Sequence, residues 1–119
     1  MDYEEFCHEI LKIDPEVRFA GIVDTNGEIR YGGEHPEITR LFTAEETKRS
    51  VLQAIDRWKL RNDLADRIGK GKYSMAEYKK LKRITVPIDD AHLLLVSTEP
   101  SADHVKVIDG IFRLKLLLK

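Results

Sequence analysis

Apolar side chains near the start of the chain recur every three or four positions, which is the period of an α-helix. Phe6, Ile10 and Ile13 form this stripe, and Asp2 stands ahead of it as a candidate N-cap. Pro15 ends the pattern, because the residue before a proline avoids the α-helical region. We therefore predict a short amphipathic helix at the start of the chain.

The next segment predicts a β-hairpin. Residues 17–23 are rich in apolar side chains, and residues 28–31 alternate between apolar and polar ones. Between them, Asp24-Thr25-Asn26-Gly27 has Asp at the first and Gly at the last position of a type I turn, and Asn-Gly is a strong hairpin signal. Residues 32–36 contain Gly-Gly and a proline, so we expect them to end the second strand and to begin a loop.

The middle of the chain predicts a long helix with two apolar stripes. Thr43 and Glu46 have the spacing of a capping box, and the helical pattern runs to Ile68 and closes at Gly69. The first apolar stripe consists of Val51, Ile55, Trp58 and Ala65, which lie on one face of the helix. The second apolar stripe lies on a different side at four-residue spacing and consists of Leu60, Leu64 and Ile68.

The last part of the chain predicts strands followed by a helix. Residues 73–81 fit either a helical turn or a strand with a bulge, and we favour the strand. Residues 84–88 alternate as in an antiparallel strand with one exposed face, and residues 93–96 form an apolar run typical of a buried central strand. We expect a final helix to begin near Ser101 or Asp103 and to run to the end of the chain.

The resulting order is α-ββ-α-β(β)β-α, which is an α+β fold with an antiparallel sheet of four to five strands and helices on its faces. This order, with a hairpin followed by a long helix, resembles the roadblock/longin/profilin-like group of sensor and scaffold folds. Three segments also look like those of an uncharacterised family of small archaeal proteins: Val17-Arg18-Phe19-Ala20-Gly21-Ile22-Val23, Gly32-Gly33 and His92-Leu93-Leu94-Leu95-Val96-Ser97. The resemblance covers most of the chain and brings no known activity or catalytic residue.

Length and composition indicate a single α+β domain spanning residues 1–119. The chain has a mass of 13.8 kDa and 42% hydrophobic residues, enough to bury a core and to exclude a disordered chain. No apolar run reaches the roughly 18 residues of a membrane-spanning helix, and the first residues lack the pattern of a secretory signal. The single cysteine, Cys7, excludes an internal disulfide. We therefore expect a cytoplasmic protein without a membrane contact.

Charge is distributed unevenly along the chain, although the total is only −1. Residues 1–39 carry a net charge of −7, residues 40–83 carry +7, and residues 84–119 carry −1. Such asymmetry indicates either an anionic partner or complementary faces that meet within or between chains. The simpler interpretation is that most of these charges lie on solvated faces of one domain.

Histidine and cysteine, the usual metal ligands and catalytic groups, form no motif in this sequence. The spacings of the four histidines match no zinc pattern, and no second cysteine accompanies Cys7. Cys7 stands among apolar residues and is expected to be a small buried side chain rather than a nucleophile. We predict no catalytic residue, no metal and no cofactor. The sequence thus favours a non-enzymatic protein, with an enzyme as the less supported alternative.

Residues 70–83, here called the basic segment, combine cations with aromatic rings. Its candidate contacts for an anion or a nucleic acid are Lys70, Lys72, Tyr73, Tyr78, Lys79, Lys80, Lys82 and Arg83. Cations that neutralise phosphates beside rings that stack on bases are features of nucleic-acid binding. However, the isoelectric point of about 6.4 is low for such a domain, and lysines on an edge strand also discourage aggregation. Nucleic-acid binding is therefore the alternative function.

The second apolar stripe requires a cover that the sequence does not specify. Either a loop or the last helix covers it within the chain, or it packs against a second copy, as the corresponding helix does in the roadblock-type dimers that the fold resembles. In a dimer, Arg57 and Arg61 beside the stripe would face the acidic first third of the partner subunit.

A ligand pocket between the sheet and a helix is a further hypothesis. It would be lined by Tyr31, Trp58 and His92, although such aromatic side chains are more often part of a core. Taken together, the sequence predicts a small cytoplasmic scaffold or sensor-like module that homodimerises and binds a protein or a small ligand.

Overall fold

A computed structural model describes residues 1–34 and 41–118 of the chain. Its elements are α1 (Tyr3–Leu11), β1 (Val17–Asp24), β2 (Ile29–Glu34), α2 (Ala44–Asp63), α3 (Ala65–Ile68), β3 (Ser74–Glu77), β4 (Lys82–Asp89), β5 (His92–Thr98) and α4 (His104–Lys115). The strands form one sheet in the order β2-β1-β5-β4-β3, and every neighbouring pair is antiparallel. The predicted α+β fold with an antiparallel sheet is confirmed, with five strands.

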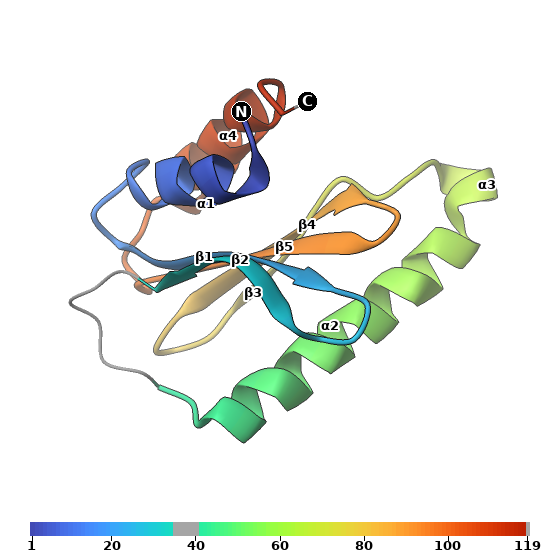
Figure 1. Ribbon diagram of the computed structural model, residues 1–119, viewed down its shortest axis with the longest axis horizontal. Coiled ribbons are helices and arrows are strands. Elements are labelled where there is room, and N and C mark those ends of the chain that lie inside the picture. The colour runs from blue at the N-terminus through green and yellow to red at the C-terminus, as the bar shows by residue number, and fades with distance from the viewer. Residues whose placement is uncertain (35–40, 119) are drawn as a thin grey trace.

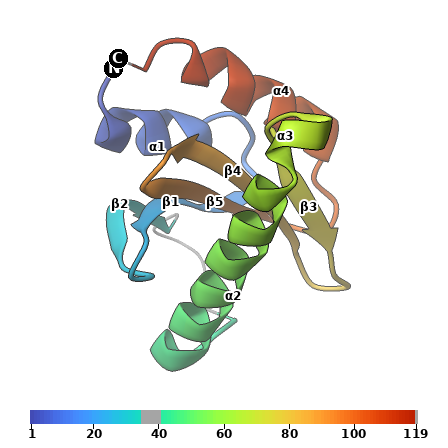
Figure 2. The ribbon, with the colours of Figure 1, turned by 90° about the vertical axis from the view of Figure 1, so that its right-hand side faces the viewer.

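The helices lie on the two faces of this sheet (Figures 1 and 2). One face carries α1 and α4, and the other carries α2. The two ends of the chain are close together, because the amino group of Met1 donates a hydrogen bond to the carbonyl of Leu117 at 3.2 Å. None of the helices in the described part of the chain is long and apolar enough to cross a membrane.

The larger of two apolar cores lies under α1 and α4. Its fully buried side chains include Phe6, Ile10, Ile22, Ile84, Val86, Leu94, Val96, Val107 and Ile111. These residues recur every two positions along the strands and every three or four along the helices, as the pattern of the sequence predicts. Cys7 is buried in the same core, where burial above all raises the pKa of its thiol to about 12. The thiol therefore stays protonated at neutral pH.

The smaller core lies between α2 and the opposite face of the sheet. It contains Val51, Ala54, Ile55 and Trp58 of the helix, packed on Val23, Leu93 and Leu95 of the strands. The Trp58 indole N–H donates a hydrogen bond to the Thr85 hydroxyl at 2.8 Å, which satisfies its polar group inside this core. The first predicted stripe of the long helix thus faces the sheet over most of its length.

Local sequence signals set the ends of the elements. Asp2, Thr43 and Asp103 each accept a hydrogen bond from a backbone N–H in the first turn of α1, α2 and α4, and Thr43 forms a full capping box with Glu46. The hairpin turn closes through a hydrogen bond from the Gly27 N–H to the Asp24 carbonyl at 3.1 Å. Gly27 has a φ of 82°, which favours glycine.

Several boundaries differ from the prediction, and the last helix, expected to run to the end of the chain, ends at Lys115. The long helix is interrupted at Leu64, whose backbone N–H donates a hydrogen bond to the Arg61 carbonyl. Asn62 and Asp63 precede this break, and side chains of these two types compete for backbone hydrogen bonds. The second strand extends through Glu34, beyond its predicted end, and residues 35 and 36 of the expected loop lie outside the described residues. The predicted strand over 73–81 is confirmed only for β3.

Candidate functional site

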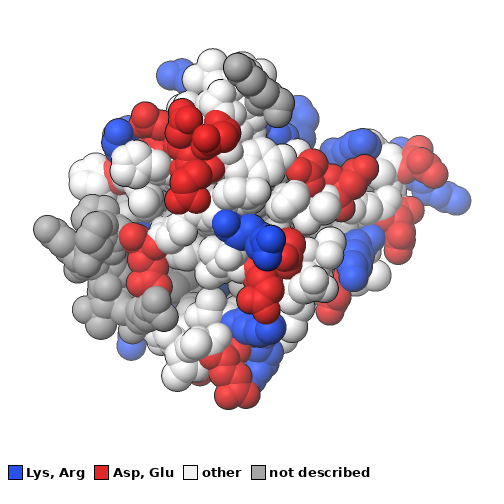
Figure 3. Space-filling view, viewed as in Figure 1, with Lys and Arg blue, Asp and Glu red and all other residues white. Residues whose placement is uncertain are grey.

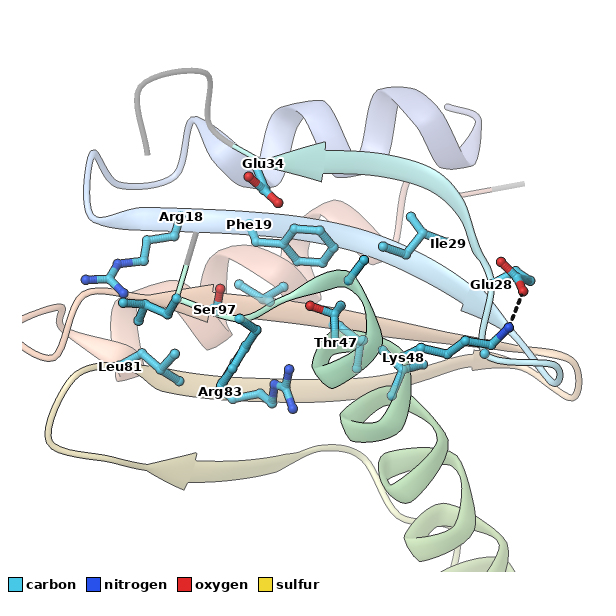
Figure 4. Close-up of a pocket in the computed structure, with 17 residues that line it drawn as sticks. Arg18, Phe19, Glu28, Ile29, Glu34, Thr47, Lys48, Leu81, Arg83 and Ser97 are labelled. Atoms are coloured by element: carbon cyan, nitrogen blue, oxygen red, sulfur yellow. Dashed lines mark hydrogen bonds and ion pairs between the residues drawn. The ribbon is translucent and has the colours of Figure 1, made fainter. Parts of the chain in front are cut away.

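A cavity of about 440 Å³, formed by described residues, lies on the α2 face of the sheet (Figure 4). It opens between the first half of α2 and strands β1, β5 and β4. Apolar side chains make up much of its wall, among them Phe19, Ile29, Phe42, Val51, Leu81 and Leu95. A concave site of this size with a mainly apolar wall and a few polar groups is typical of small-molecule binding.

Charged side chains stand at different parts of this cavity. Glu28 and Lys48 form an ion pair at 2.8 Å, drawn as the dashed line in Figure 4. Arg18, at the opposite end of the view, is held by Glu99 through an ion pair at 2.5 Å. Arg83 donates a hydrogen bond to the Ser50 hydroxyl, with its guanidinium carbon 5.9 Å from the centre of the Phe42 ring. The wall of the cavity is therefore largely apolar and carries charged side chains of both signs, including Glu28 and Glu34.

Arg83 also borders a second, smaller niche of about 40 Å³ on the same side of the sheet. This niche lies between α2 and strands β3 and β4, and Arg57, Arg61 and Trp58 of α2 form one of its walls. Burial lowers the pKa of the Arg83 guanidinium. The interaction with Tyr78 raises this pKa, whereas the positive charge of Arg57 lowers it further. The positive charges of Arg57 and Arg83 are therefore close enough to repel each other.

The residues predicted to line a ligand pocket do not line the 440 Å³ cavity. Trp58 borders the smaller niche, whereas Tyr31 and His92 lie together at the end of the sheet near α1, with ring centres 6.3 Å apart. Alternation along β2 explains this placement, because Tyr31 is paired with Ile22, whose side chain faces the α1 core. A cavity between sheet and helix does exist, but different residues form it.

Tyr31 and His92 belong to an aromatic and acidic cluster that also includes Tyr3 and Asp89. Asp89 accepts a hydrogen bond from the Tyr3 hydroxyl at 2.6 Å and lies 2.9 Å from Nδ1 of His92. The hydrogen bond to Asp89 is the main cause that raises the pKa of Tyr3 to about 12. Sequence reasoning missed Tyr3 and Asp89, which are 86 residues apart, because no local pattern links them. Nowhere in residues 1–34 and 41–118 do three His, Cys, Asp or Glu residues gather so as to hold a metal ion.

The second apolar stripe is exposed along its whole length. Leu60, Leu64 and Ile68 expose 68%, 53% and 79% of their surface, so neither a loop nor α4 covers them within the described residues. The interruption of the helix places Leu64 at the junction of α2 and α3 and Ile68 at the end of α3. Arg57 and Arg61 lie on the neighbouring side of α2, where they border the small niche instead of an acidic surface.

The basic segment is divided by the fold. Four lysines are exposed, namely Lys70, Lys72, Lys79 and Lys80, and so are Tyr73 and Tyr78. Lys82, in contrast, is only 7% exposed, and its ammonium donates to the Ala102 carbonyl at 2.7 Å and lies 3.0 Å from Nδ1 of His104. Lys82 is therefore not a surface contact for an anion, and Arg83 faces α2. The exposed lysines surround β3, which is an edge strand as predicted.

Charge on the molecular surface follows the asymmetry of the sequence. In the view of Figure 3, acidic side chains gather over α1, whereas acidic and basic side chains alternate along α2 and α3. Although α1 and α2 lie on opposite faces of the sheet, the acidic and the basic part of the chain meet at the Glu28–Lys48 ion pair.

Comparison with protein families gives a match over residues 1–114, to a family described as a family of unknown function, DUF6659. The chain belongs to the DUF6659 family. This agrees with the predicted resemblance to a family without a known activity. A comparison with curated proteins finds no match to this DUF6659 chain.

Solved structures with the same fold share little sequence with the DUF6659 chain. A roadblock/LC7 domain from Streptomyces avermitilis is 12% identical, with a TM-score of 0.71 over 98% of this chain and 94% of that one. The gliding protein MglB from Thermus thermophilus is 15% identical, with a TM-score of 0.74 over 93% and 81%. Profilin from Schizosaccharomyces pombe is 8% identical, with a TM-score of 0.64 over 97% and 94%. The predicted roadblock/profilin-like fold is thereby confirmed.

Proposed function

We propose that this chain is a small non-enzymatic scaffold or sensor-like module of the cytoplasm that homodimerises through the end of α2 and through α3, and that binds a protein or small ligand. The observation that carries the proposal is the exposed second apolar stripe, Leu60, Leu64 and Ile68. Burying a large aliphatic side chain contributes about 1.5–3 kcal/mol, so covering the three would contribute roughly 5 kcal/mol to association. Their exposure in a single chain supports a contact with a second copy.

The arrangement of the fold supports a two-fold contact between the α2 helices of two copies. In such a contact the same stripe meets itself, so one exposed apolar surface is sufficient for both subunits. The acidic residues over α1 lie on the opposite face of the sheet, away from α2. We therefore no longer expect Arg57 and Arg61 to face the acidic first third of the partner subunit in this dimer.

The ligand part of the proposal is supported by the 440 Å³ cavity on the α2 face. Its volume lies within the range of about 300–1,000 Å³ found for small-molecule sites. The cavity is bordered by the first half of α2, whereas the second apolar stripe runs from the end of α2 into α3. Ligand binding and dimer formation would therefore use separate parts of the molecule.

Substitution Leu64→Glu tests the dimer. We expect the variant to be monomeric in size-exclusion chromatography with light scattering, because a carboxylate in the middle of the contact would have to be desolvated. Its free energy of unfolding, measured on dilute protein, should stay within about 0.5 kcal/mol of the wild type, since Leu64 is exposed in the single chain. Lys59→Gln, an equal change of charge at another exposed position of α2, is the control and should leave the dimer intact.

The exposed lysines and tyrosines of the basic segment support a second candidate function, nucleic-acid binding. Lys70, Lys72, Lys79 and Lys80 surround the exposed rings of Tyr73 and Tyr78. Salt-sensitive binding of single-stranded RNA that weakens when Lys79 and Lys80 are both changed to Ala would support it. An absence of binding at low salt would contradict it.

A further inference from the structure

The niche between α2, β3 and β4 is lined by three arginines and by no acidic residue. Arg57 and Arg61 approach it from α2, and Arg83 approaches it from β4. Of the nine described residues that form its wall, the others are apolar, hydroxyl-bearing or aromatic. Three arginine side chains thus contribute to the wall of one small space, and none of the described residues in that wall is acidic.

We propose that this niche binds a phosphate group, with Arg57, Arg61 and Arg83 as its cationic contacts. The proposal is independent of the dimer, because all three arginines come from one chain. It also differs from the predicted basic surface of residues 70–83, since two of its three cations belong to α2.

The fold holds two of the three guanidinium groups in place. Arg61 stacks on Trp58, with its guanidinium carbon 4.7 Å from the ring centre, and donates to the Ser74 hydroxyl at 3.3 Å. Trp58 is itself fixed by its hydrogen bond to Thr85. Arg83 is half-buried and anchored through Ser50. Binding groups that are already ordered lose less conformational freedom when a ligand arrives.

The third guanidinium is free to move onto a ligand. Arg57 is exposed and makes no ion pair or hydrogen bond with any residue in 1–34 or 41–118. Nevertheless it is close enough to Arg83 to lower the pKa of that group, in addition to the larger effect of burial. An anion between them would replace this repulsion with two attractive contacts.

The number and shape of the cations favour phosphate over a carboxylate. A guanidinium offers parallel N–H donors that match two oxygens of a phosphate, and three of them can surround a tetrahedral group. A phosphate near neutral pH carries close to two negative charges, which offset more of the three positive charges than a carboxylate does. At about 40 Å³ the niche is far smaller than the roughly 300–1,000 Å³ of a typical small-molecule site, so only a compact group would be held there.

Trp58 provides a direct measurement, because it is the single tryptophan of the chain and borders the niche. The full chain is titrated with sodium orthophosphate at fixed ionic strength, and the fluorescence of Trp58 is followed, with sodium chloride as the reference. We expect a saturable change with phosphate and none with chloride. Arg57→Gln should weaken the apparent affinity at least about tenfold, because it removes a charge-assisted contact.

Two further variants keep the result interpretable. Arg67→Gln removes an exposed arginine of α3 that borders no part of the niche, and it should bind phosphate as the wild type does. Leu64→Glu should also retain binding, since the niche lies within one chain. The proposal is overturned if the wild type shows no saturable change with either orthophosphate or a short single-stranded RNA, if Arg57→Gln binds as well as the wild type, or if Leu64→Glu abolishes binding.

A parallel titration with a short single-stranded RNA distinguishes a free phosphate from one carried on a polymer. Binding of orthophosphate that is weakened by Arg57→Gln assigns the niche to a small phosphorylated ligand. Binding of the RNA alone, lost in Arg57→Gln, assigns the niche to a phosphate of a nucleic-acid backbone. Binding of the RNA that Arg57→Gln leaves unchanged overturns the proposal for that ligand.

Discussion

Lys82 is a cation inside the fold, although the sequence around it is strongly basic. Its side chain lies on the same side of β4 as Ile84 and Val86, toward α4. The ammonium group is satisfied by the Ala102 carbonyl and by His104, at the beginning of α4. Lys82 thus connects the sheet to the start of the last helix, and we regard it as a structural residue.

Substitution Lys82→Ala should therefore destabilise the fold. It removes the buried part of the side chain and leaves the Ala102 carbonyl without this partner, so we expect a loss of about 1–3 kcal/mol in the free energy of unfolding. Urea unfolding followed by circular dichroism measures this loss. The exposed neighbour Lys80 is the control, and Lys80→Ala should cost less than about 0.5 kcal/mol. Equal effects of the two substitutions would contradict a buried role for Lys82.

The Asp89 carboxylate makes the stability of the fold depend on pH. Burial opposes its charged form, but hydrogen bonds from Tyr3, the Ala91 N–H and His92, with the charge of His92, outweigh burial and lower the pKa of Asp89. A carboxyl with a lowered pKa stabilises the folded state above its ordinary pKa. This stabilisation is lost as the pH falls through the folded-state value.

Asp89→Asn should reduce the pH dependence of the free energy of unfolding in acid. Between about pH 5 and pH 3, the free energy of unfolding should fall less steeply in the variant than in the wild type, because one titrating group is removed. Urea unfolding at a series of pH values measures this slope. Asp90→Asn, at the exposed neighbouring position, should keep the slope of the wild type. If both variants behave alike, the contacts of Asp89 do not affect stability.

At the scale of elements, β2 depends on one glycine where α1 approaches the sheet. Gly32 has a φ of 82°, and its N–H donates to the Glu4 carboxylate at 3.0 Å. A Cβ at this position would collide with the Ala20 carbonyl oxygen and would lie 2.8 Å from the Cβ of Cys7. At Gly33, the next residue, an added Cβ would meet nothing within 4 Å. Two adjacent glycines therefore have different structural roles.

Gly32→Ala should destabilise the protein by at least about 2 kcal/mol, since it combines a strained backbone with a collision that involves the main chain. Gly33→Ala should be neutral or stabilising by up to about 1 kcal/mol, because it restricts the unfolded chain and has space in the folded one. Thermal and urea unfolding of the two variants compare them directly. A larger loss for Gly33→Ala would contradict the observed path of β2.

The elements were predictable where their signals are local. The cap at Asp2, the capping box at Thr43 and the turn at Asp24 depend on residues within a few positions of each other, and all three form as predicted. The break at Leu64 was not predicted, because the apolar spacing continues through it. The alternation of β4 places Lys82 on the same side as the core residues Ile84 and Val86, but the lysines around it led us to predict an exposed side chain.

At the scale of the whole molecule, the sites depend on contacts that the sequence does not display. Arg57 and Arg83 belong to different elements, and only the packing of α2 on the sheet brings them to one niche. The same packing forms the large cavity from residues that show no common motif. The fold class was predictable from the order of elements, whereas the lining of a cavity depends on how helices cross strands and on which side chains fill the space between them.

The exposed second apolar stripe is a feature of the molecule that the single chain leaves unexplained. Apolar side chains that stay exposed to water do not stabilise the folded chain, whereas the same side chains covered by a second copy stabilise the assembly of the two. We therefore propose that the functional form of this chain is a homodimer.

Sedimentation equilibrium of the wild-type chain at micromolar concentrations tests this claim most directly. We expect the wild-type protein to have twice the mass of the 13.8 kDa chain, and Leu64→Glu to have the mass of one chain. A wild-type chain that sediments at 13.8 kDa throughout this concentration range would contradict it.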